Sequence, residues 1–357
     1  MNESQQLIRD KYTPLGALTD RTLTVASPWD LKPIAEVAMM DEAEAFMCLA
    51  RLKQCFDSRK MPRVFERIEI LKKAARSIAA KREAYADLIS FEGGKPRKDA
   101  LVEVDRAVVS IELAAEEASR WHGTEMPMRR TKAASGHLAF TIPDPIGVVF
   151  SVSAFNHPLN LIAHQVAPAI AAGCPVLIKP ALETPLSCLH FVEALYDAGL
   201  PEDMCLALIA DNAVSEAIVR SPQIAFFSFI GSAKVGWHLR TLLAPGVRFS
   251  LEHGGSAPAI VDASADLSLA IPSLVKGGYY HAGQVCVSTQ RVFVHEGVWS
   301  EFRTGFEDAV KLLKTGDPRL PEVDCGPIIS NSRRKTVFAT SKGFAGTVEN
   351  LFRRLLT

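Results

Sequence analysis

The fold is decided by the stretch Gly147-Val148-Val149-Phe150-Ser151-Val152, a short and nearly continuous apolar run. A helical pattern over about residues 160–172 follows it, and a second apolar run at 175–179 comes next. Helical patterns and apolar runs then continue in turn at about 186–198, 204–209, 213–221, 224–230 and from 234. Near-continuous apolar strands that alternate with helices are typical of a parallel sheet covered on both faces. The sequence therefore predicts a doubly wound α/β fold.

The segment upstream of this alternation is mainly helical by its pattern. From Asp41 to about residue 90, apolar side chains recur at a spacing of roughly 3.6, and Asp41 is a good N-cap for the first helix. The run Gly93-Gly94-Lys95-Pro96 interrupts the pattern, and another helix is predicted from about 97 to 121. A strand-like spacing over 136–155, broken by Pro143-Asp144-Pro145, leads into the alternating part.

The composition argues against several classes of protein. The chain has 357 residues, of which 48% are hydrophobic, and its 40 basic and 40 acidic side chains balance. A chain of this length suggests two domains or one large α/β body. The zero net charge gives no electrostatic reason to expect nucleic acid or an anionic membrane as a partner.

Cysteine usage and the N-terminal segment bear on location. The seven cysteines are scattered without a C-x-x-C pair, which is neither a disulfide framework nor a zinc cluster. No cluster of His, Cys or carboxylate has the spacing of a metal site, so no metal is predicted. The N-terminus lacks the apolar core of a signal peptide, and no stretch reaches the ~20 apolar residues of a membrane helix. These features favour a cytoplasmic protein.

Four local sequences carry the chemistry, and their order says more than any one of them alone. The first, directly after a predicted strand, is Ser153-Ala154-Phe155-Asn156-His157-Pro158. The second is Val176-Leu177-Ile178-Lys179-Pro180, and the third is Phe229-Ile230-Gly231-Ser232-Ala233-Lys234-Val235-Gly236. The fourth pairs Leu251-Glu252-His253-Gly254-Gly255 with Gly283-Gln284-Val285-Cys286.

In type, order and spacing, these segments are similar to the signature motifs of the NAD(P)-dependent aldehyde dehydrogenase superfamily. Glu252 and Cys286 take the places of the family's glutamate and cysteine, and they lie 34 positions apart, as is usual in the family. The similarity runs from about Val25 to about Val337 and includes the stretch E-G-G-K-P at 92–96. It implies an aldehyde-dehydrogenase-like architecture, with a Rossmann-type cofactor domain and an α/β catalytic domain.

Cys286 is the predicted nucleophile, and Asn156 is predicted to stabilise the oxyanion that its attack creates. An aldehyde loses hydride readily only as a tetrahedral alkoxide, and a thiolate both adds well to the carbonyl and is later displaced by water. The resemblance gives Cys286 this role, through a thiohemiacetal and then a thioester. It also implies that the amide N–H of Asn156 and the backbone N–H of Cys286 stabilise the oxyanion, although a plain turn residue is the alternative for Asn156. The other six cysteines are interpreted as buried structural residues.

Glu252 is the predicted general base. It precedes two glycines, which leaves its carboxylate free to swing toward the water that hydrolyses the thioester. Its neighbours Phe249 and Leu251 and the run 257–261 have the composition of buried residues. We therefore expect Glu252 to lie in a buried setting, where a glutamate usually has a function.

The predicted cofactor site lies where a strand gives way to a helix. The segment 231–236 is not the G-x-G-x-x-G fingerprint, but it opens a helix, whose terminal N–H groups can hold a pyrophosphate. The resemblance implies that Gly231, Ser232 and Gly236 contact the cofactor phosphates and that Lys179 contacts the adenosine ribose. Phe155 is assigned to the same cofactor site.

The sequence allows either NAD or NADP as the cofactor. Many NAD-preferring members carry an acidic residue three positions after the lysine, and Leu182 stands at that position. Because leucine does not repel a 2′-phosphate, we predict that NADP is accepted, with Glu183 as an alternative acidic group. Gln165 stands where the family often has a lysine, and glutamine supplies no cation.

The C-terminal part departs most from the family. Similarity continues through 317–328, but the tail at 344–355 does not match the expected continuation. We therefore expect a truncated chain that lacks the second half of the catalytic domain and the strand used for oligomerisation. The predicted division is a cofactor domain of residues 1–126 and 146–253, an oligomerisation hairpin of 127–145, and a truncated catalytic domain of 254–357.

These features predict an enzyme that oxidises an aldehyde to a carboxylic acid with NAD(P)⁺. The segment 154–160 resembles the branch that handles small polar aldehydes such as lactaldehyde or phosphonoacetaldehyde. Three alternatives stay open: acyl transfer to coenzyme A, against which Glu252 argues; a cysteine esterase without cofactor; and a catalytically inactive truncated remnant that at most binds nucleotide. The family implies a homo-oligomer, and the missing strand argues against one here.

Overall fold

A five-stranded parallel sheet forms the centre of the computed structural model, which describes residues 7–341. The strand order is β10-β9-β6-β7-β8, and each neighbouring pair is parallel. The strands are β6 (Val148–Val152), β7 (Val176–Lys179), β8 (Cys205–Ala207), β9 (Ile224–Gly231) and β10 (Arg248–His253). Parallel strands joined by helices confirm the predicted doubly wound α/β fold.

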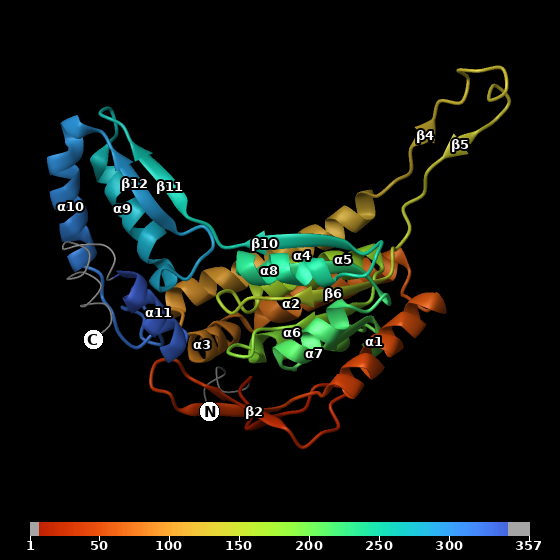
Figure 1. Ribbon diagram of the computed structural model, residues 1–357, viewed down its shortest axis with the longest axis horizontal. Helices are drawn as coiled ribbons and strands as arrows, with labels where there is room; N and C mark the ends of the chain where they lie inside the picture. The colour runs from red at the N-terminus through yellow and green to blue at the C-terminus, as the bar shows by residue number, and fades with distance from the viewer. Residues whose placement is uncertain (1–6, 342–357) are drawn as a thin grey trace.

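Helices cover both faces of this sheet (Figure 1). Val149 and Phe150 are neighbours in β6, and their side chains join separate apolar clusters, as the alternation along a strand requires. The cluster around Val149 contains residues of α2 (Val64–Ala80), α3 (Arg82–Gly93), α4 (Arg97–Arg120), α5 (Asn160–Ala172) and α6 (Leu186–Asp197). The cluster around Phe150 contains residues of α1 (Glu42–Asp57), α7 (Asn212–Val219) and α8 (Ala233–Leu242).

The predicted helical stretch after Asp41 consists of three helices, α1, α2 and α3. Asp41 is the N-cap of α1: its Oδ1 accepts from the backbone N–H of Glu44 at 2.9 Å, and its own N–H donates to Oε2 of Glu44 at 2.8 Å. This reciprocal pair satisfies two of the N–H groups that a helix start leaves free. Gly94 ends α3 with a φ of 67°, a left-handed conformation that glycine adopts without strain.

Two smaller sheets lie outside the central one. Near the N-terminus, β3 (Pro33–Ala38) pairs with β1 (Lys11–Tyr12) and β2 (Thr22–Ala26). The strands β4 (Glu125–Met126) and β5 (Ala139–Phe140) form an antiparallel ribbon that projects from the body (Figure 1). The strand β5 lies within the predicted hairpin of 127–145 and β4 lies just before it, and the role of the ribbon in oligomerisation stays a prediction.

The part of the chain after β10 forms a separate layer at the end of the molecule opposite the ribbon (Figure 1). It contains a parallel pair, β11 (Ala257–Val261) and β12 (Thr289–Val294), with the helices α9 (Leu267–Tyr279), α10 (Trp299–Lys311) and α11 (Asn331–Ser341). We call this part, residues 254–341, the second region. The tail at 344–355 that departs from the family lies outside the described residues, and the predicted domain boundaries stay predictions.

Candidate active site

The predicted site residues gather at the carboxyl edge of the central sheet. Asn156 follows β6, Lys179 ends β7, Ser232 follows β9, and Glu252 lies near the end of β10. All these strands are parallel, so their carboxyl ends share one edge, which is where open α/β sheets bind ligands. Topology alone therefore brings together segments that are far apart in the sequence.

Cys286 differs from every other cysteine in the chain. It lies in the turn between α9 and β12, and its side chain is exposed. The remaining six, which are Cys48, Cys55, Cys174, Cys188, Cys205 and Cys325, are all buried and free of disulfides. The prediction that these six are structural core residues is confirmed, and the thiol at 286 is available to a substrate.

Asn156 lies against the loop that carries Cys286. Its Nδ2 donates to the carbonyl oxygen of Gln284 at 2.8 Å. A carboxamide has two N–H groups, so this bond leaves one of them for another acceptor. The predicted oxyanion donor and the predicted nucleophile therefore lie on neighbouring loops. Asn156 contacts Gln284, which precedes Cys286 by two positions.

Gln284 holds that loop in place, a role that the sequence did not reveal. Its side chain donates to the carbonyl of Pro327 at 3.3 Å and accepts from the N–H of Ile329 at 2.9 Å. The loop is thereby fixed on one side by Asn156 and on the other by residues 327–329. Both 283–286 and 325–328 resemble segments of the family, but nothing in the sequence shows that they contact each other.

Glu252 is exposed, so the prediction that it lies in a buried setting is wrong. Its neighbour Phe249 is 41% exposed, and Ile260 in β11 is 83% exposed. The cause is the position of the strands: β10 is an edge strand paired only with β9, and β11 pairs only with β12. On β10 the guanidinium of Arg240 lies 5.0 Å from the ring centre of Phe249 without burying it, and Ile260 on β11 stays open to solvent.

The turn after Glu252 nevertheless contacts the Cys286 loop. A Cβ atom placed on Gly255 would lie 3.0 Å from the carbonyl oxygen of Cys286. Glycine permits this close approach of two backbones. The predicted base and the predicted nucleophile therefore belong to touching segments, although Glu252 itself points into an open environment.

A left-handed backbone stretch leads into the Cys286 loop. His281 and Ala282 have φ values of 48° and 56°, and they are followed by Gly283 at 71°. Non-glycine residues in this region carry strain of about 1–3 kcal/mol each, which persists only where surrounding contacts hold it. The ring of His281 is buried, and burial holds the pKa of His281 well below its usual range, so the imidazole is neutral.

The predicted cofactor residues lie at the ends of β7 and β9. Lys179 is only 4% exposed, and burial lowers the pKa of its ammonium group. No described residue accepts a hydrogen bond from that ammonium. Ser232 is the N-cap of α8 and accepts from the N–H of Val235 at 3.4 Å, so the predicted helix start is confirmed.

Local packing also explains the two glycines of this segment. A Cβ atom on Gly231 would lie 2.7 Å from the ring of Phe229, and one on Gly236 would lie 2.5 Å from Cε1 of His253. A side chain at either position would have to displace the ring that it meets. Packing against Phe229 and His253 therefore favours glycine at both positions, independently of any phosphate.

Three further residues that stand out in the sequence are buried or half-buried. Gln165 is buried, and its Nε2 donates to the carbonyl of Val152 at 3.2 Å and to Oγ of Ser228 at 3.0 Å. Leu182 is half-buried, and Glu183 is exposed beside it. Phe155 is half-buried, and its carbonyl accepts from Oγ1 of Thr184 at 3.3 Å.

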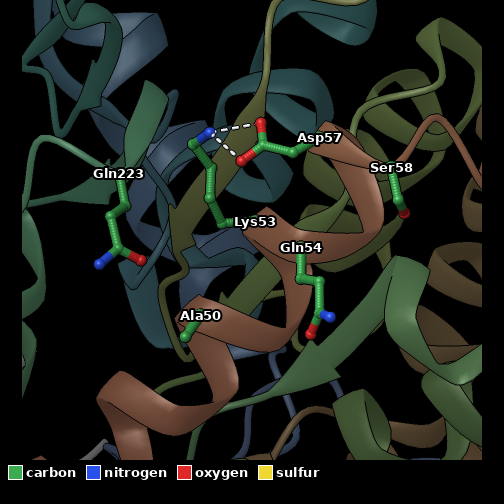
Figure 2. Close-up of a pocket in the computed structure, with 6 residues that line it drawn as sticks. All are labelled: Ala50, Lys53, Gln54, Asp57, Ser58 and Gln223. Atoms are coloured by element: carbon green, nitrogen blue, oxygen red, sulfur yellow. Dashed lines mark hydrogen bonds and ion pairs between the residues drawn. The ribbon is translucent and has the colours of Figure 1, made fainter.

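A hollow on the surface of α1 does not belong to this site (Figure 2). It is lined by Ala50, Lys53, Gln54, Asp57, Ser58 and Gln223. Lys53 donates to Oδ2 of Asp57 at 2.6 Å, so its charged groups satisfy each other. Within residues 7–341, no group of three or more His, Cys, Asp or Glu side chains could hold a metal ion, and no helix is long and apolar enough to cross a membrane.

The five-stranded parallel sheet with helices on both faces defines a Rossmann-type α/β protein. Residues 17–343 match the aldehyde dehydrogenase family, so the chain belongs to that family. It is 33% identical over 313 residues to the 3-sulfolactaldehyde dehydrogenase of Priestia aryabhattai, a match that covers 87% of this chain and 65% of that protein. The chain spans 60 to 65% of the length of the first curated relatives that it matches.

Solved structures show the same fold. Aldehyde dehydrogenase 21 from Physcomitrella patens, in complex with succinate, superimposes with a TM-score of 0.89 at 33% identity, over 93% of this chain and 70% of that chain. The glyceraldehyde-3-phosphate dehydrogenase of Methanocaldococcus jannaschii, complexed with NADP, superimposes with a TM-score of 0.85 at 30% identity, over 91% and 71%. The predicted family and its aldehyde dehydrogenase fold are confirmed.

Proposed function

We propose that this chain oxidises an aldehyde to a carboxylic acid with NAD(P)⁺, using Cys286 as nucleophile. The observation that carries the proposal is the hydrogen bond from Asn156 to the carbonyl of Gln284, which places an amide donor beside the loop of the exposed thiol. Family membership supports the same reaction. Among the seven cysteines, 286 alone combines exposure with such a neighbour.

The proposed chemistry uses three side chains in turn. The sulfur of Cys286 adds to the carbonyl carbon, its proton leaves to solvent, and the remaining N–H of Asn156 donates to the new oxyanion together with the backbone N–H of Cys286. After oxidation the acyl group is held as a thioester. Glu252 then takes a proton from a water molecule as that water attacks the thioester carbon, and the C–S bond breaks to release the acid.

The residues at the ends of β7 and β9 fit a dinucleotide. Lys179 has a buried side chain whose ammonium has no described acceptor, and the first turn of α8 offers backbone N–H groups beside Ser232. When bound, the nicotinamide supplies the hydride acceptor that the oxidation needs. Lys179 would hold the ribose end of the dinucleotide, and the α8 terminus would hold its phosphates.

A catalytically inactive protein that at most binds nucleotide is the second candidate. The observation that favours it is the exposure of Glu252 and of the outer side of β11, where Ile260 is 83% exposed. Electrostatic interactions around reacting groups are stronger where bulk water is excluded, and an exposed Glu252 lacks that setting. This candidate predicts cofactor binding without turnover.

One experiment separates the two candidates. The purified chain is mixed with NAD⁺ or NADP⁺ and a short aldehyde, NAD(P)H absorbance is followed, and nucleotide affinity is measured by calorimetry. Cys286→Ala abolishes turnover and leaves nucleotide binding intact if the proposal holds. Cys325→Ala is the matched control, because it removes a buried thiol of the same region and leaves turnover in place. Nucleotide binding by the wild type with no turnover would favour the inactive candidate.

We also infer that NADP is accepted. Leu182 brings no charge near the predicted ribose site, and the neighbouring Glu183 is exposed. In Leu182→Glu, a new carboxylate would repel the 2′-phosphate, so kcat/KM with NADP falls by about tenfold or more while the value with NAD changes less. Equal losses with both cofactors would contradict this assignment.

The proposed substrate is a small polar aldehyde. The named relatives support this class: one is a 3-sulfolactaldehyde dehydrogenase, and one solved structure holds succinate. A panel of lactaldehyde, succinate semialdehyde and 3-sulfolactaldehyde, with hexanal for comparison, tests it through kcat/KM. A preference for hexanal over all three polar aldehydes would overturn the proposal.

The β4–β5 ribbon is the proposed contact between copies of the chain. Its exposed apolar side chains include Leu138 at 76%, Phe140 at 60% and Ile142 at 73%. Clusters of exposed apolar side chains of this kind mark interaction surfaces. Sedimentation of the wild type and of Phe140→Asp tests the contact: a dimer or tetramer that dissociates in the variant supports it, and identical sedimentation contradicts it.

A further inference from the structure

A buried ion pair lies behind the proposed active site. Lys95, from the turn between α3 and α4, contacts Glu103 on α4, and their side chains are 1% and 0% exposed. The other ion pairs recorded within residues 7–341 each include a side chain that is at least 20% exposed. A buried pair is costly to desolvate, and apolar replacements of similar volume are often no less stable. Stability alone therefore does not explain why a lysine and a glutamate stand here.

Glu103 fixes the start of α5. Its Oε1 accepts from the backbone N–H groups of Leu159 at 3.0 Å and Asn160 at 3.1 Å. A carboxylate at a helix N-terminus also interacts favourably with the helix dipole. Because α5 begins only a few residues after Asn156, the position of Glu103 determines where the segment carrying that amide can lie.

Lys95 contacts the other proposed catalytic segment. Its Nζ lies 5.9 Å from the ring centre of Tyr280, within the range of a cation–π interaction. Tyr280 follows α9 and directly precedes the left-handed stretch that leads to Cys286. The hydroxyl of Tyr280 lies 3.4 Å from Nε2 of His157, so this ring joins the two segments directly as well.

We propose that Lys95 and Glu103 act as a positioning pair that sets the Asn156 segment and the Cys286 loop relative to each other. Glu103 holds the first through the start of α5, and Lys95 holds the second through Tyr280. The two catalytic groups never touch the pair itself, and the pair touches no substrate. The catalytic part of this inference rests on the proposed function, whereas the structural part does not.

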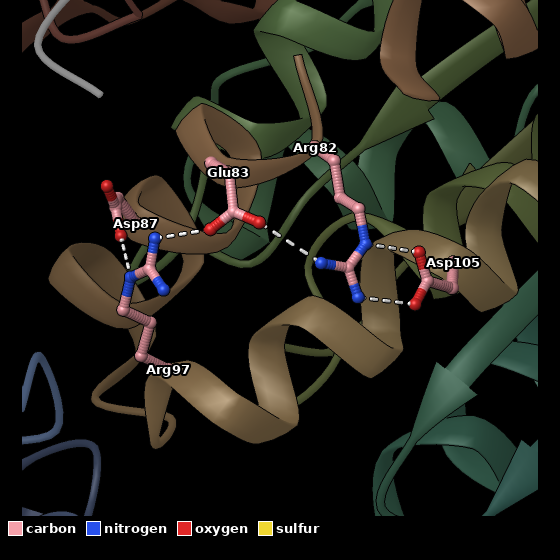
Figure 3. Close-up of polar contacts among 5 residues, drawn as sticks. All are labelled: Arg82, Glu83, Asp87, Arg97 and Asp105. Atoms are coloured by element: carbon pink, nitrogen blue, oxygen red, sulfur yellow. Dashed lines mark hydrogen bonds and ion pairs between the residues drawn. The ribbon is translucent and has the colours of Figure 1, made fainter. Parts of the chain in front are cut away.

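The test compares two double variants, each of which removes an ion pair whose acidic residue lies on α4. Lys95→Met with Glu103→Gln removes both buried charges, and the glutamine oxygen can still accept from the start of α5. The control is Arg82→Met with Asp105→Asn, which removes an exposed bidentate pair (2.6 and 2.7 Å) whose aspartate lies two residues from Glu103 (Figure 3). Tyr280→Phe is a milder third variant that keeps the ring and removes the hydroxyl near His157.

Two properties are measured for each variant. They are backbone hydrogen exchange, and kcat and KM with an aldehyde that the wild type oxidises. The proposal predicts that the Lys95 and Glu103 variant exchanges about tenfold faster or more in segments 153–161 and 280–288, and not in the rest of the sheet. It also predicts a fall in kcat of about tenfold to a hundredfold with KM little changed, since a small misplacement of catalytic groups costs that much. Tyr280→Phe changes both in the same direction by less.

Three outcomes would overturn the inference. The first is unchanged exchange in both segments, and the second is faster exchange throughout the chain. The third is the same change in exchange in the Arg82 and Asp105 control. A wild type without turnover would defeat the proposed function, and the exchange pattern would then decide the positioning role by itself. If the double variant does not fold, exchange in Tyr280→Phe decides between the same outcomes.

Discussion

The strands of the central sheet and of the second region have similar apolar composition, but their side chains differ in how far they are buried. In β6 and β7, Phe150 and Leu177 are fully buried. In β11, the run Ala257–Val261 has the same apolar character, yet Ile260 is 83% exposed. The difference is the cover: the central strands carry helices on both faces, whereas no described residue packs on the outer side of β11. Apolar composition predicts a strand, and only its neighbours determine whether it is buried.

The largest expected effect concerns the reactivity of the seven thiols. A thiol reagent such as dithionitrobenzoate should modify Cys286 rapidly and the six buried cysteines about a thousandfold more slowly, because those must wait for local opening. Cys286→Ser removes the fast phase, and denaturant makes all remaining thiols react. The informative residue is Cys325, which is buried at 3% within the second region. If Cys325 reacts as fast as Cys286, the second region opens far more readily than the central sheet, although Cys325 is buried.

The next largest effect is on core packing. Phe150→Ala should lower the free energy of unfolding by about 3–5 kcal/mol, because it empties a fully buried position. Phe293→Ala in β12, where the side chain is 55% exposed, should lower it by less than about 1 kcal/mol. Urea denaturation followed by circular dichroism measures both. Equal losses at the two positions would mean that Phe293 is covered in solution, for example by a second copy of the chain.

The contrast also shows what could be predicted of the fold. Strand and helix positions followed from apolar runs and periodicity, as for α5 (Asn160–Ala172), because helices on both faces make those runs nearly continuous. The cap at Asp41 followed from local chemistry alone. The exposure of Glu252 could not be predicted, because it depends on which strands flank β10 and β11. Edge positions are a property of topology, and the local pattern of residues does not encode them.

A third prediction uses pH to separate the two regions. Glu92 is fully buried, and burial raises its pKa from the usual value of 4.5 to about 7, despite hydrogen bonds from Leu186 and Ser187. The folded protein therefore binds this proton more tightly than the unfolded chain does. As pH rises from 4.5 through 7, the wild type should lose up to about 3 kcal/mol of stability relative to Glu92→Gln, and nothing further above that window.

The second region supplies the control with the opposite sign. Asp266 is exposed and accepts from the N–H of Ser268 at 2.9 Å at the start of α9, and its hydrogen bonds with Ser268 lower the pKa of Asp266. Its contribution is present at neutral pH and is lost as pH falls through that lowered value. Asp266→Asn should therefore show the opposite pH trend in urea denaturation. The prediction for Glu92 fails if the stability difference between wild type and Glu92→Gln is flat between about pH 5 and 7.

The residues of the proposed site could be named from the sequence, but the contacts that join them could not. Sequence motifs pointed to Asn156, Glu252 and Cys286 because the types of residue suit the chemistry. The residues that connect them, Lys95 and Gln284, stand in segments that resemble the family, but nothing in the sequence showed what they contact. A buried lysine and an exposed one look alike in a sequence, and partners 43 positions apart, such as Gln284 and Pro327, share no periodicity. Contacts of this kind depend on how loops meet at the edge of the sheet.

The smallest expected effect concerns ion pairs in the two regions. Arg82 and Asp105 form a bidentate contact that joins α3 to α4 (Figure 3), whereas Arg303 and Glu307 form a single contact of 2.8 Å within α10. Both pairs are exposed, so double-mutant cycles should give about 0.5–1 kcal/mol for the first and about 0.3–0.5 kcal/mol for the second. At about 1 M salt both values should fall toward zero, because the screening length drops to about 3 Å. A coupling free energy between Arg82 and Asp105 that persists at high salt would show that this pair is shielded from solvent. The pair would then stabilise the packing of α3 on α4 and would not be a mere surface contact.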